Sequence, residues 1–374
     1  MKIKVLLLII ISSLFTSCLY NDFEPSEWAV DPQLDFSKSV VLFNSAVSQD
    51  SVVVFTNYQE LQISSSEDWC KVNIDYTSSM IKINADPNFN SEQRSAIITV
   101  LVSKGNKELS KNISVVQMGG VWEIVGDFNV YWAYSPSPSQ KNVLENLLQN
   151  MIYVQGGGFL MGNTDDAIVD SATPHHVNLK SYYIGKFEIT QEQFRAIMGY
   201  NPSEIRGEQL PVYGISWAEA MDFVTRFATL TNLKVSLPTE AQWEYAALGG
   251  KDSRGYRYSG SNDYSQVAVI ATDENEMRPS DVGAKMSNEL GIYDMSGNVA
   301  EYCSDWFQPN YVDANRDNPS GPVTGTFKCV RGGSFSDITT IAQLKCTNRF
   351  SWSKGINKIT PFTGFRIVIE DEKK

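Results

Sequence analysis

Histidine and clustered basic residues are scarce in this chain of 374 residues, and each shortage excludes a class of function. The only two histidines, His175 and His176, are adjacent, so one chain cannot assemble a metal centre from three imidazoles. Lys and Arg number 31 against 43 Asp and Glu, a net charge of -12. Without a Lys- or Arg-rich run to attract phosphates, the sequence argues against a nucleic-acid partner.

Long hydrophobic runs are also missing beyond the N-terminus. Two lysines precede an apolar run over 5–15, which is shorter than the roughly 20 residues of a membrane-spanning helix. The pattern predicts a signal peptide over 1–17. Residues 15–18 (FTSC) resemble a bacterial lipobox, which implies a lipidated Cys18, a tether over 18–29 and export to the outer membrane, on its periplasmic face or at the cell surface. A plain secretory signal with an incidental cysteine is the alternative.

Cysteine is too sparse for a disulfide framework. After Cys18, four cysteines remain in a long chain. Pairing of Cys346 with Cys303 or with Cys329 stays open, and Cys70 is expected to be a buried thiol.

The length of the chain predicts two domains. The sequence of the first domain predicts a series of short β-strands. Ser, Asn, Asp and Gly clusters separate short apolar segments within 30–120, as in a small β-sandwich. The expected strands are 40–43, 51–55, 61–63, 80–83, 96–102 and 113–116. Five segments in order, 56–58 (TNY), 68–69 (DW), 84–86 (NAD), 94–97 (RSAI) and 115–119 (VVQMG), resemble a BACON domain. That resemblance implies an immunoglobulin-like fold of Bacteroidetes surface proteins.

Residues 121–149 are expected to link the two domains. Aromatic residues without clear periodicity predict an irregular connector that packs on a neighbour, with glycan stacking by Trp122 or Trp132 as the alternative. Apolar residues then recur on one helical face up to Met151, which predicts a short amphipathic helix.

The second domain, over 150–371, mixes capped helices with long loops. Three segments, 190–193, 216–219 and 239–242, fit the capping box and predict three helix starts. Nine segments of this domain, in order, resemble the formylglycine-generating enzyme, or sulfatase-modifying factor, family. They are 151–162 (MIYVQGGGFLMG), 174–177 (PHHV), 183–190 (YIGKFEIT), 211–212 (PV), 216–217 (SW), 237–247 (LPTEAQWEYAA), 291–301 (GIYDMSGNVAE), 331–335 (RGGSF) and 364–366 (GFR). The resemblance implies an α+β fold related to C-type lectins, with many loops.

The resemblance also implies where catalytic groups would lie. The enzymes of this family hold copper(I) between two cysteines, at positions that carry Asp337 and Ala342 in this chain. Neither is a thiolate, the ligand that copper(I) selects, so no copper site is expected there. Ser334 matches a serine of the substrate groove, and Tyr302 stands where the enzymes commonly have Trp. Ser334, Tyr302 and Asp337 therefore define the expected groove, with no catalytic residue assigned.

A structural calcium ion is expected in the segment 294–301, which resembles the calcium loop of the family. The resemblance implies the Glu301 carboxylate and the backbone carbonyls of Ser296, Gly297 and Val299 as ligands, because calcium prefers hard oxygen atoms. The alternative is that the segment merely caps its own loop.

These observations lead to three functional hypotheses. The first is a lipid-anchored surface protein whose non-catalytic domain binds a glycan or a surface protein. The second is an active formylglycine-generating oxidase that uses Cys303, Cys329 or Cys346 in a rearranged site. The third is a scaffold lipoprotein of a surface machine.

Overall fold

A computed structural model describes residues 32–371 apart from 44, 46–47, 58–60, 105–106, 133–135, 164–172, 312–315 and 338–339. The predicted signal peptide, the tether and Cys18 lie outside the described residues. Within the described part, every helix is too short or too polar to cross a lipid bilayer.

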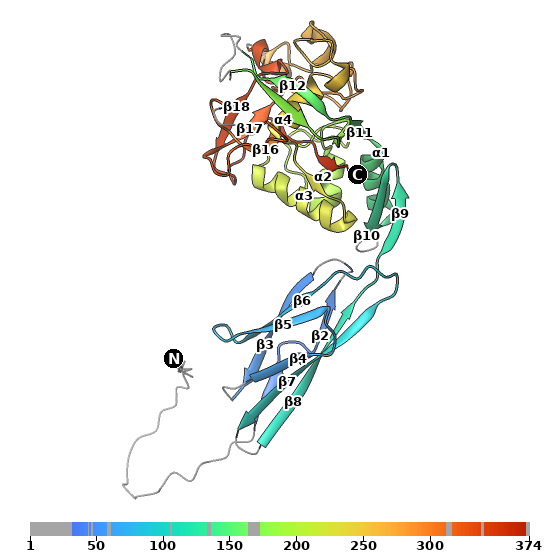
Figure 1. The fold of residues 1–374 in the computed structure, drawn as a ribbon, viewed down its shortest axis with the longest axis vertical. Coiled ribbons are helices and arrows are strands. Elements are labelled where there is room, and N and C mark those ends of the chain that lie inside the picture. Colours follow the sequence, from blue (N-terminus) through green and yellow to red (C-terminus); the bar gives the residue numbers. More distant parts are fainter. Residues whose placement is uncertain are drawn as a thin grey trace, which may run out of the picture.

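The N-terminal domain consists of two four-stranded sheets that share one core (Figure 1). The first sheet has the order β1 (Leu34–Phe36), β3 (Ser48–Thr56), β6 (Met80–Ala85), β5 (Cys70–Asp75). The second has the order β2 (Val40–Phe43), β8 (Lys107–Gln117), β7 (Arg94–Lys104), β4 (Leu61–Ser65). Alternate residues of the strands face inward, so Val52 and Ile83 of one sheet meet Val100 and Val115 of the other.

All six expected strands are present in this domain, and two more, β1 and β5, were missed. β1 is three residues long, and only Cys70 of β5 is fully buried, so neither strand gives a strong apolar alternation. Cys70 is a free, buried thiol, as expected.

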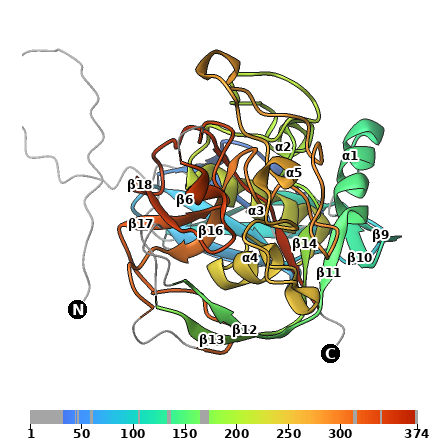
Figure 2. The ribbon, with the colours of Figure 1, turned by 90° about the horizontal axis from the view of Figure 1, so that it is seen from above.

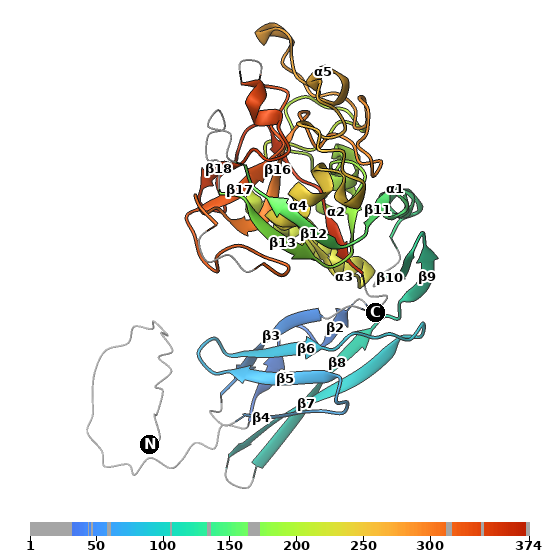
Figure 3. The same cartoon turned by 45° about the horizontal axis from the view of Figure 1, so that its top comes forward.

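The expected irregular connector is wrong for residues 121–132, which form a β-hairpin. β9 (Val121–Val125) and β10 (Phe128–Trp132) pair around a two-residue turn in which Gly126 has a φ of +59°. Glycine tolerates that conformation, and a Gly-Asp pair between apolar runs is a hairpin signal. Val130 and Trp132 are buried in the core of the second domain, and the Trp132 Nε1 donates to Glu123 at 2.8 Å. Figure 3 shows the hairpin between the sandwich and the second domain.

Four capping boxes place four helices around that core. α2 (Gln191–Met198), α3 (Trp217–Thr231) and α4 (Glu240–Ala247) begin at the expected caps. α1 (Pro138–Gln149) confirms the expected amphipathic helix and has its own box at Ser137. In each box a hydroxyl oxygen accepts from a backbone amide three residues later. α5 (Tyr264–Val267) is a single short turn in the loop-rich half.

The strands of the second domain bring distant segments together (Figure 2). One sheet has the order β11 (Met151–Val154), β14 (Tyr182–Gly185), β20 (Val368–Glu370), β15 (Val235–Ser236). Another has the order β18 (Phe350–Lys354), β17 (Phe327–Arg331), β16 (Ala300–Trp306), β19 (Thr363–Gly364). β12 (Gly157–Met161) and β13 (His175–Leu179) form a separate hairpin. α4 lies against β12, β16 and β17, where the site described below is built.

The hairpin β9–β10 should behave as part of the core. Trp132→Ala removes a buried indole and is expected to lower the free energy of unfolding by about 3–5 kcal/mol. Trp122→Ala is the matched control, because Trp122 is 54% exposed, and it should cost less than about 1 kcal/mol. Urea denaturation of both variants tests this, and equal losses would contradict the assignment.

Candidate functional site

Two glutamates of α4 form a buried ion-pair network with two arginines. Glu240 and Glu244 lie one helical turn apart on the same face. Arg349 donates from Nε and Nη2 to the two oxygens of Glu240 at 2.6 and 2.8 Å. Arg331 Nε lies 3.2 Å from Glu240 Oε1, and Arg331 Nη2 forms an ion pair with Glu244 Oε2. Burial opposes ionisation of Glu240, but Arg349 and Arg331 outweigh it and lower its pKa to about 2.

A second ion pair occupies the residue expected to bind calcium. Arg366 donates to Glu301 through Nε at 2.7 Å and Nη2 at 2.6 Å, and Trp243 Nε1 donates at 2.8 Å. Both carboxylate oxygens of Glu301 are therefore saturated with hydrogen-bond donors, one of them cationic. A calcium ligand must instead turn its oxygens toward the ion, so Glu301 does not fit that role.

The Ser296 hydroxyl and two backbone amides of the expected calcium loop hydrogen-bond to the protein, while the expected carbonyl ligands of Ser296, Gly297 and Val299 stay a prediction. Ser296 Oγ donates to the Leu344 carbonyl at 2.7 Å, and Gly297 N donates to the Gly332 carbonyl at 2.9 Å. Val299 N donates to Glu188 Oε1 at 2.9 Å. Across the described ranges, no three His, Cys, Asp or Glu side chains are arranged to hold a metal ion.

Two further buried carboxylates interact electrostatically with Arg366. Glu188 accepts from Asn298 Nδ2 at 2.6 Å, and Asp294 Oδ2 accepts from Gly283 N at 2.6 Å, while Asp294 Oδ1 has no hydrogen-bond partner. Arg366 therefore interacts electrostatically with the carboxylates of Glu301, Glu188 and Asp294. Burial and the neighbouring carboxylates raise the pKa of Glu188 well above its usual value, and burial raises that of Asp294 to about 6.

The expected groove residues do not all come together. Tyr302 is a correction, because its side chain is fully buried and its hydroxyl is 2.7 Å from Thr360 Oγ1 and 3.1 Å from the Ile215 carbonyl. Ser334 is also buried, and its backbone N–H donates to Asp337 Oδ2 at 2.6 Å. Only Asp337 of the three is partly exposed. Tyr302 was placed in the groove because it stands where the enzymes commonly have Trp, whereas its hydroxyl is satisfied inside the fold by Thr360 and the Ile215 carbonyl.

Two cysteines meet on neighbouring strands. Tyr302 pairs with Val330 across β16 and β17, and next to this pair, where the register shifts, the thiols of Cys303 and Cys329 hydrogen-bond to each other. Both are fully buried, and burial raises the pKa of both thiols. Cys346 donates to the Ala247 carbonyl instead. All four described cysteines are free, so neither disulfide with Cys346 is formed.

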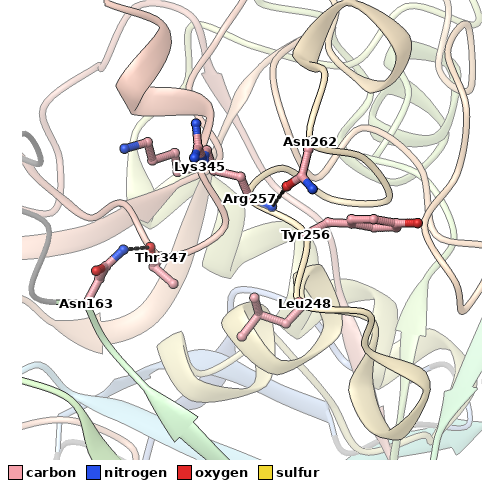
Figure 4. A pocket seen from close by; sticks show the side chains of 8 residues that line it. Asn163, Leu248, Tyr256, Arg257, Asn262, Lys345 and Thr347 are labelled. Atoms are coloured by element: carbon pink, nitrogen blue, oxygen red, sulfur yellow. Dashed lines mark hydrogen bonds between the residues drawn. The ribbon is translucent and has the colours of Figure 1, made fainter.

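A polar pocket of about 340 Å³ opens where loops meet the end of β12 (Figure 4). It is lined by Asn163, Leu248, Gly255, Tyr256, Arg257, Asn262, Lys345 and Thr347. These residues come from separate loops and carry no motif, so sequence reasoning missed them.

The histidine pair does not form a metal site in this arrangement. His175 packs its ring on Tyr311, with centroids 4.4 Å apart, and His176 next to it on β13 is exposed. Neighbours on a strand point to opposite sides, so the two imidazoles do not face a common point.

The motifs that resemble the sulfatase-modifying factor family thus supply the charged residues of the buried network other than Arg349, and the caps of α2, α3 and α4. Residues 136–371 match the family model described as "Sulfatase-modifying factor enzyme 1-like domain". The chain belongs to this family.

Relatives within the family carry different names. The chain is 30% identical over 270 residues to the "Chaperone protein LppX" of Paenibacillus barcinonensis, covering 59% of this chain and 89% of that protein. It is 33% identical over 139 residues to the formylglycine-generating enzyme of Streptomyces coelicolor, covering 33% of this chain and 42% of the enzyme. The structure titled "Treponema denticola variable protein 1" shares the fold, with a TM-score of 0.53 and 24% identity over 67% of this chain and 99% of that one.

The pair between Arg366 and Glu301 should be essential for stability. Arg366→Met leaves the buried carboxylates without their cation and is expected to lower the free energy of unfolding by about 3–5 kcal/mol. Arg195→Met is the control, because the pair of Arg195 with Glu208 is about half exposed and contributes about 0–1 kcal/mol. Denaturant titration separates the two, and a small loss for Arg366→Met would contradict this role.

The raised pKa of Asp294 predicts a pH-dependent stability. Between about pH 4 and 6 the folded protein holds a proton on Asp294 that the unfolded chain releases, so stability falls as the pH rises through this window. The slope contributed by one such group is at most about 1.4 kcal/mol per pH unit. Asp294→Asn should flatten the profile, whereas Asp252→Asn, at an exposed aspartate, should not. Unfolding free energies at pH 4, 5, 6 and 7 test this, and superimposable profiles would refute it.

Proposed function

We propose that this chain is an exported, lipid-anchored protein whose sulfatase-modifying-factor-like domain binds a glycan or a surface protein without catalysing its modification. In this proposal Cys18 carries the lipid at the outer membrane, and an immunoglobulin-like sandwich resembling a BACON domain holds the second domain away from the bilayer. A structural calcium ion stays a prediction, but Glu301 is not among its proposed ligands.

The proposal that the domain is not catalytic rests on where its thiols lie. The positions that hold copper(I) in the enzymes carry Asp337 and Ala342. A reactive cysteine must be accessible and deprotonated, whereas Cys303 and Cys329 are buried and burial raises their pKa. The described residues therefore do not fit a copper(I) centre that a substrate could reach.

Two observations support a binding role. Buried ion pairs tie α4, β16, β17 and Arg366 together, so the domain has a fixed core on which loops can present a site. The name of the Paenibacillus relative, a chaperone protein, favours a protein as partner.

The adjacency of Cys303 and Cys329 favours one alternative, an oxidase with a rearranged cysteine site. That function would require the strands β16 and β17 to open, because the side chain of each cysteine is fully buried between them and α4.

A conversion assay distinguishes the two functions. Residues 19–374, copper(I), oxygen and a reductant are incubated with a sulfatase-motif peptide that contains cysteine, beside an active formylglycine-generating enzyme. We expect the control to convert the peptide thiol to an aldehyde and this protein to leave the peptide mass unchanged. Conversion that is lost in Cys303→Ala and Cys329→Ala would establish the alternative.

A further inference from the structure

Strand β10 places side chains in both domains. Successive residues of a strand point to opposite sides. Val130 and Trp132 belong to the apolar core of the second domain, and Tyr131 between them points the other way. Tyr131 is only 1% exposed, and its hydroxyl donates to the Asn88 carbonyl of the sandwich. One strand is therefore attached to the interior of the second domain and to a loop of the first.

The ring of Tyr131 is enclosed by residues from both sides. Its centroid lies 5.3 Å from that of Phe89 in the sandwich and 5.0 Å from that of Trp122 on β9. These separations are typical of favourable aromatic pairs. Gly120 lies so close to the ring that a Cβ added there would overlap Tyr131 Cζ. Glycine thus permits a close contact between the backbone and the ring.

The loop of the sandwich that receives Tyr131 is itself held in place. Asn88 is fully buried, and its Nδ2 donates to the carbonyls of Glu92 at 2.8 Å and Met118 at 3.2 Å. Arg94 at the start of β7 donates from Nη2 to the Asp86 carbonyl at 2.6 Å. Hydrogen bonds therefore connect the loop between β6 and β7 to the chain that leaves β8. The hydroxyl of Tyr131 binds a fixed part of the sandwich.

The chain that passes between the domains is short and hydrogen-bonded (Figure 1). Residues 118–120 alone separate β8 from β9. Within them, Met118 N donates to the Phe43 carbonyl at 3.0 Å and Gly120 N to the Asn90 carbonyl at 3.1 Å. Domains of one chain are expected to move relative to each other unless their interface prevents it. Here the contacts of the connecting chain and of Tyr131 oppose such motion.

We propose that residues 118–132 form a rigid joint, in which Tyr131 fixes the orientation of the second domain relative to the sandwich. Hinges consist of a few loop or element-terminal residues that absorb a change in backbone angles. Residues 118–120 would form such a hinge if Tyr131 did not contact the sandwich. The joint makes the two domains one body, so the second domain presents a constant face to a partner. This inference goes beyond the binding function above and does not depend on it.

Distance measurement between one spin label in each domain tests the joint on residues 19–374. Gln62→Cys on β4 and Thr229→Cys on α3 place the labels at exposed positions of regular elements. The four cysteines that the structure describes are buried, so the label reacts preferentially with the introduced thiols. Pulsed electron double resonance should give one narrow distance distribution. A broad distribution, or one with several maxima, would overturn the proposal.

Matched variants test the part played by Tyr131. Tyr131→Ala removes the contact with the sandwich, and Gly120→Ala adds a Cβ where the ring lies and displaces it. Each should at least double the width of the distance distribution. Tyr76→Ala makes the same truncation at a tyrosine of the sandwich that is 61% exposed, and it should leave the width unchanged.

Circular dichroism and urea denaturation show whether each variant is folded, and Gly120→Ala decides if Tyr131→Ala is not. A folded variant of the joint whose distribution is as narrow as that of the parent would refute the role of Tyr131. None of these outcomes changes the result of the peptide conversion assay. Failure of the rigid joint and failure of the non-catalytic function are therefore distinguishable.

Discussion

Buried pairing of carboxylates with arginines holds the second domain together. Strands β16 and β17, helix α4 and the segment of Arg366 each contribute one or more charges that no water reaches. Isolated charges in such an interior would be prohibitively costly, so the loops that carry Arg349 and Arg366 are fixed by the need to neutralise Glu240 and Glu301. A domain with little regular structure thereby gains a defined core.

This framework also changes how the family motifs are interpreted. Residues in the motifs of an enzyme family are commonly assigned catalytic or metal-binding roles. In this chain, however, Glu301 accepts hydrogen bonds from Arg366, and Tyr302 hydrogen-bonds to Thr360. The same motifs therefore specify the fold whether or not a reaction takes place. Function depends on the loops around the framework, and the family resemblance matches Asp337 and Ala342 of this chain to the copper-binding cysteines of the enzymes.

Local patterns predicted much of the fold. The caps at Thr190, Ser216 and Thr239 were identifiable because each box involves only four consecutive residues. The hairpin at 121–132 was missed because its aromatic residues obscured the alternation, although the Gly-Asp turn marked it.

The candidate sites were much harder to predict, because they depend on contacts between distant segments. Glu301 and Arg366, which form an ion pair, are 65 positions apart in the sequence. The pocket likewise combines side chains from positions between 163 and 347. Nothing in the local sequence of Asn163 or Arg257 distinguishes them from ordinary loop residues. The meeting of Cys303 with Cys329 likewise depends on strand register, which the spacing of the cysteines does not give.

The central claim is that this domain combines a buried acid–arginine network with thiols that are not reactive. Titration of the folded protein with copper(I), in competition with a chelator of known affinity, tests it most directly. The account predicts that the chelator retains all the copper until the protein is unfolded. Retention of one copper(I) ion per folded chain, lost on Cys303→Ala or Cys329→Ala, would contradict it.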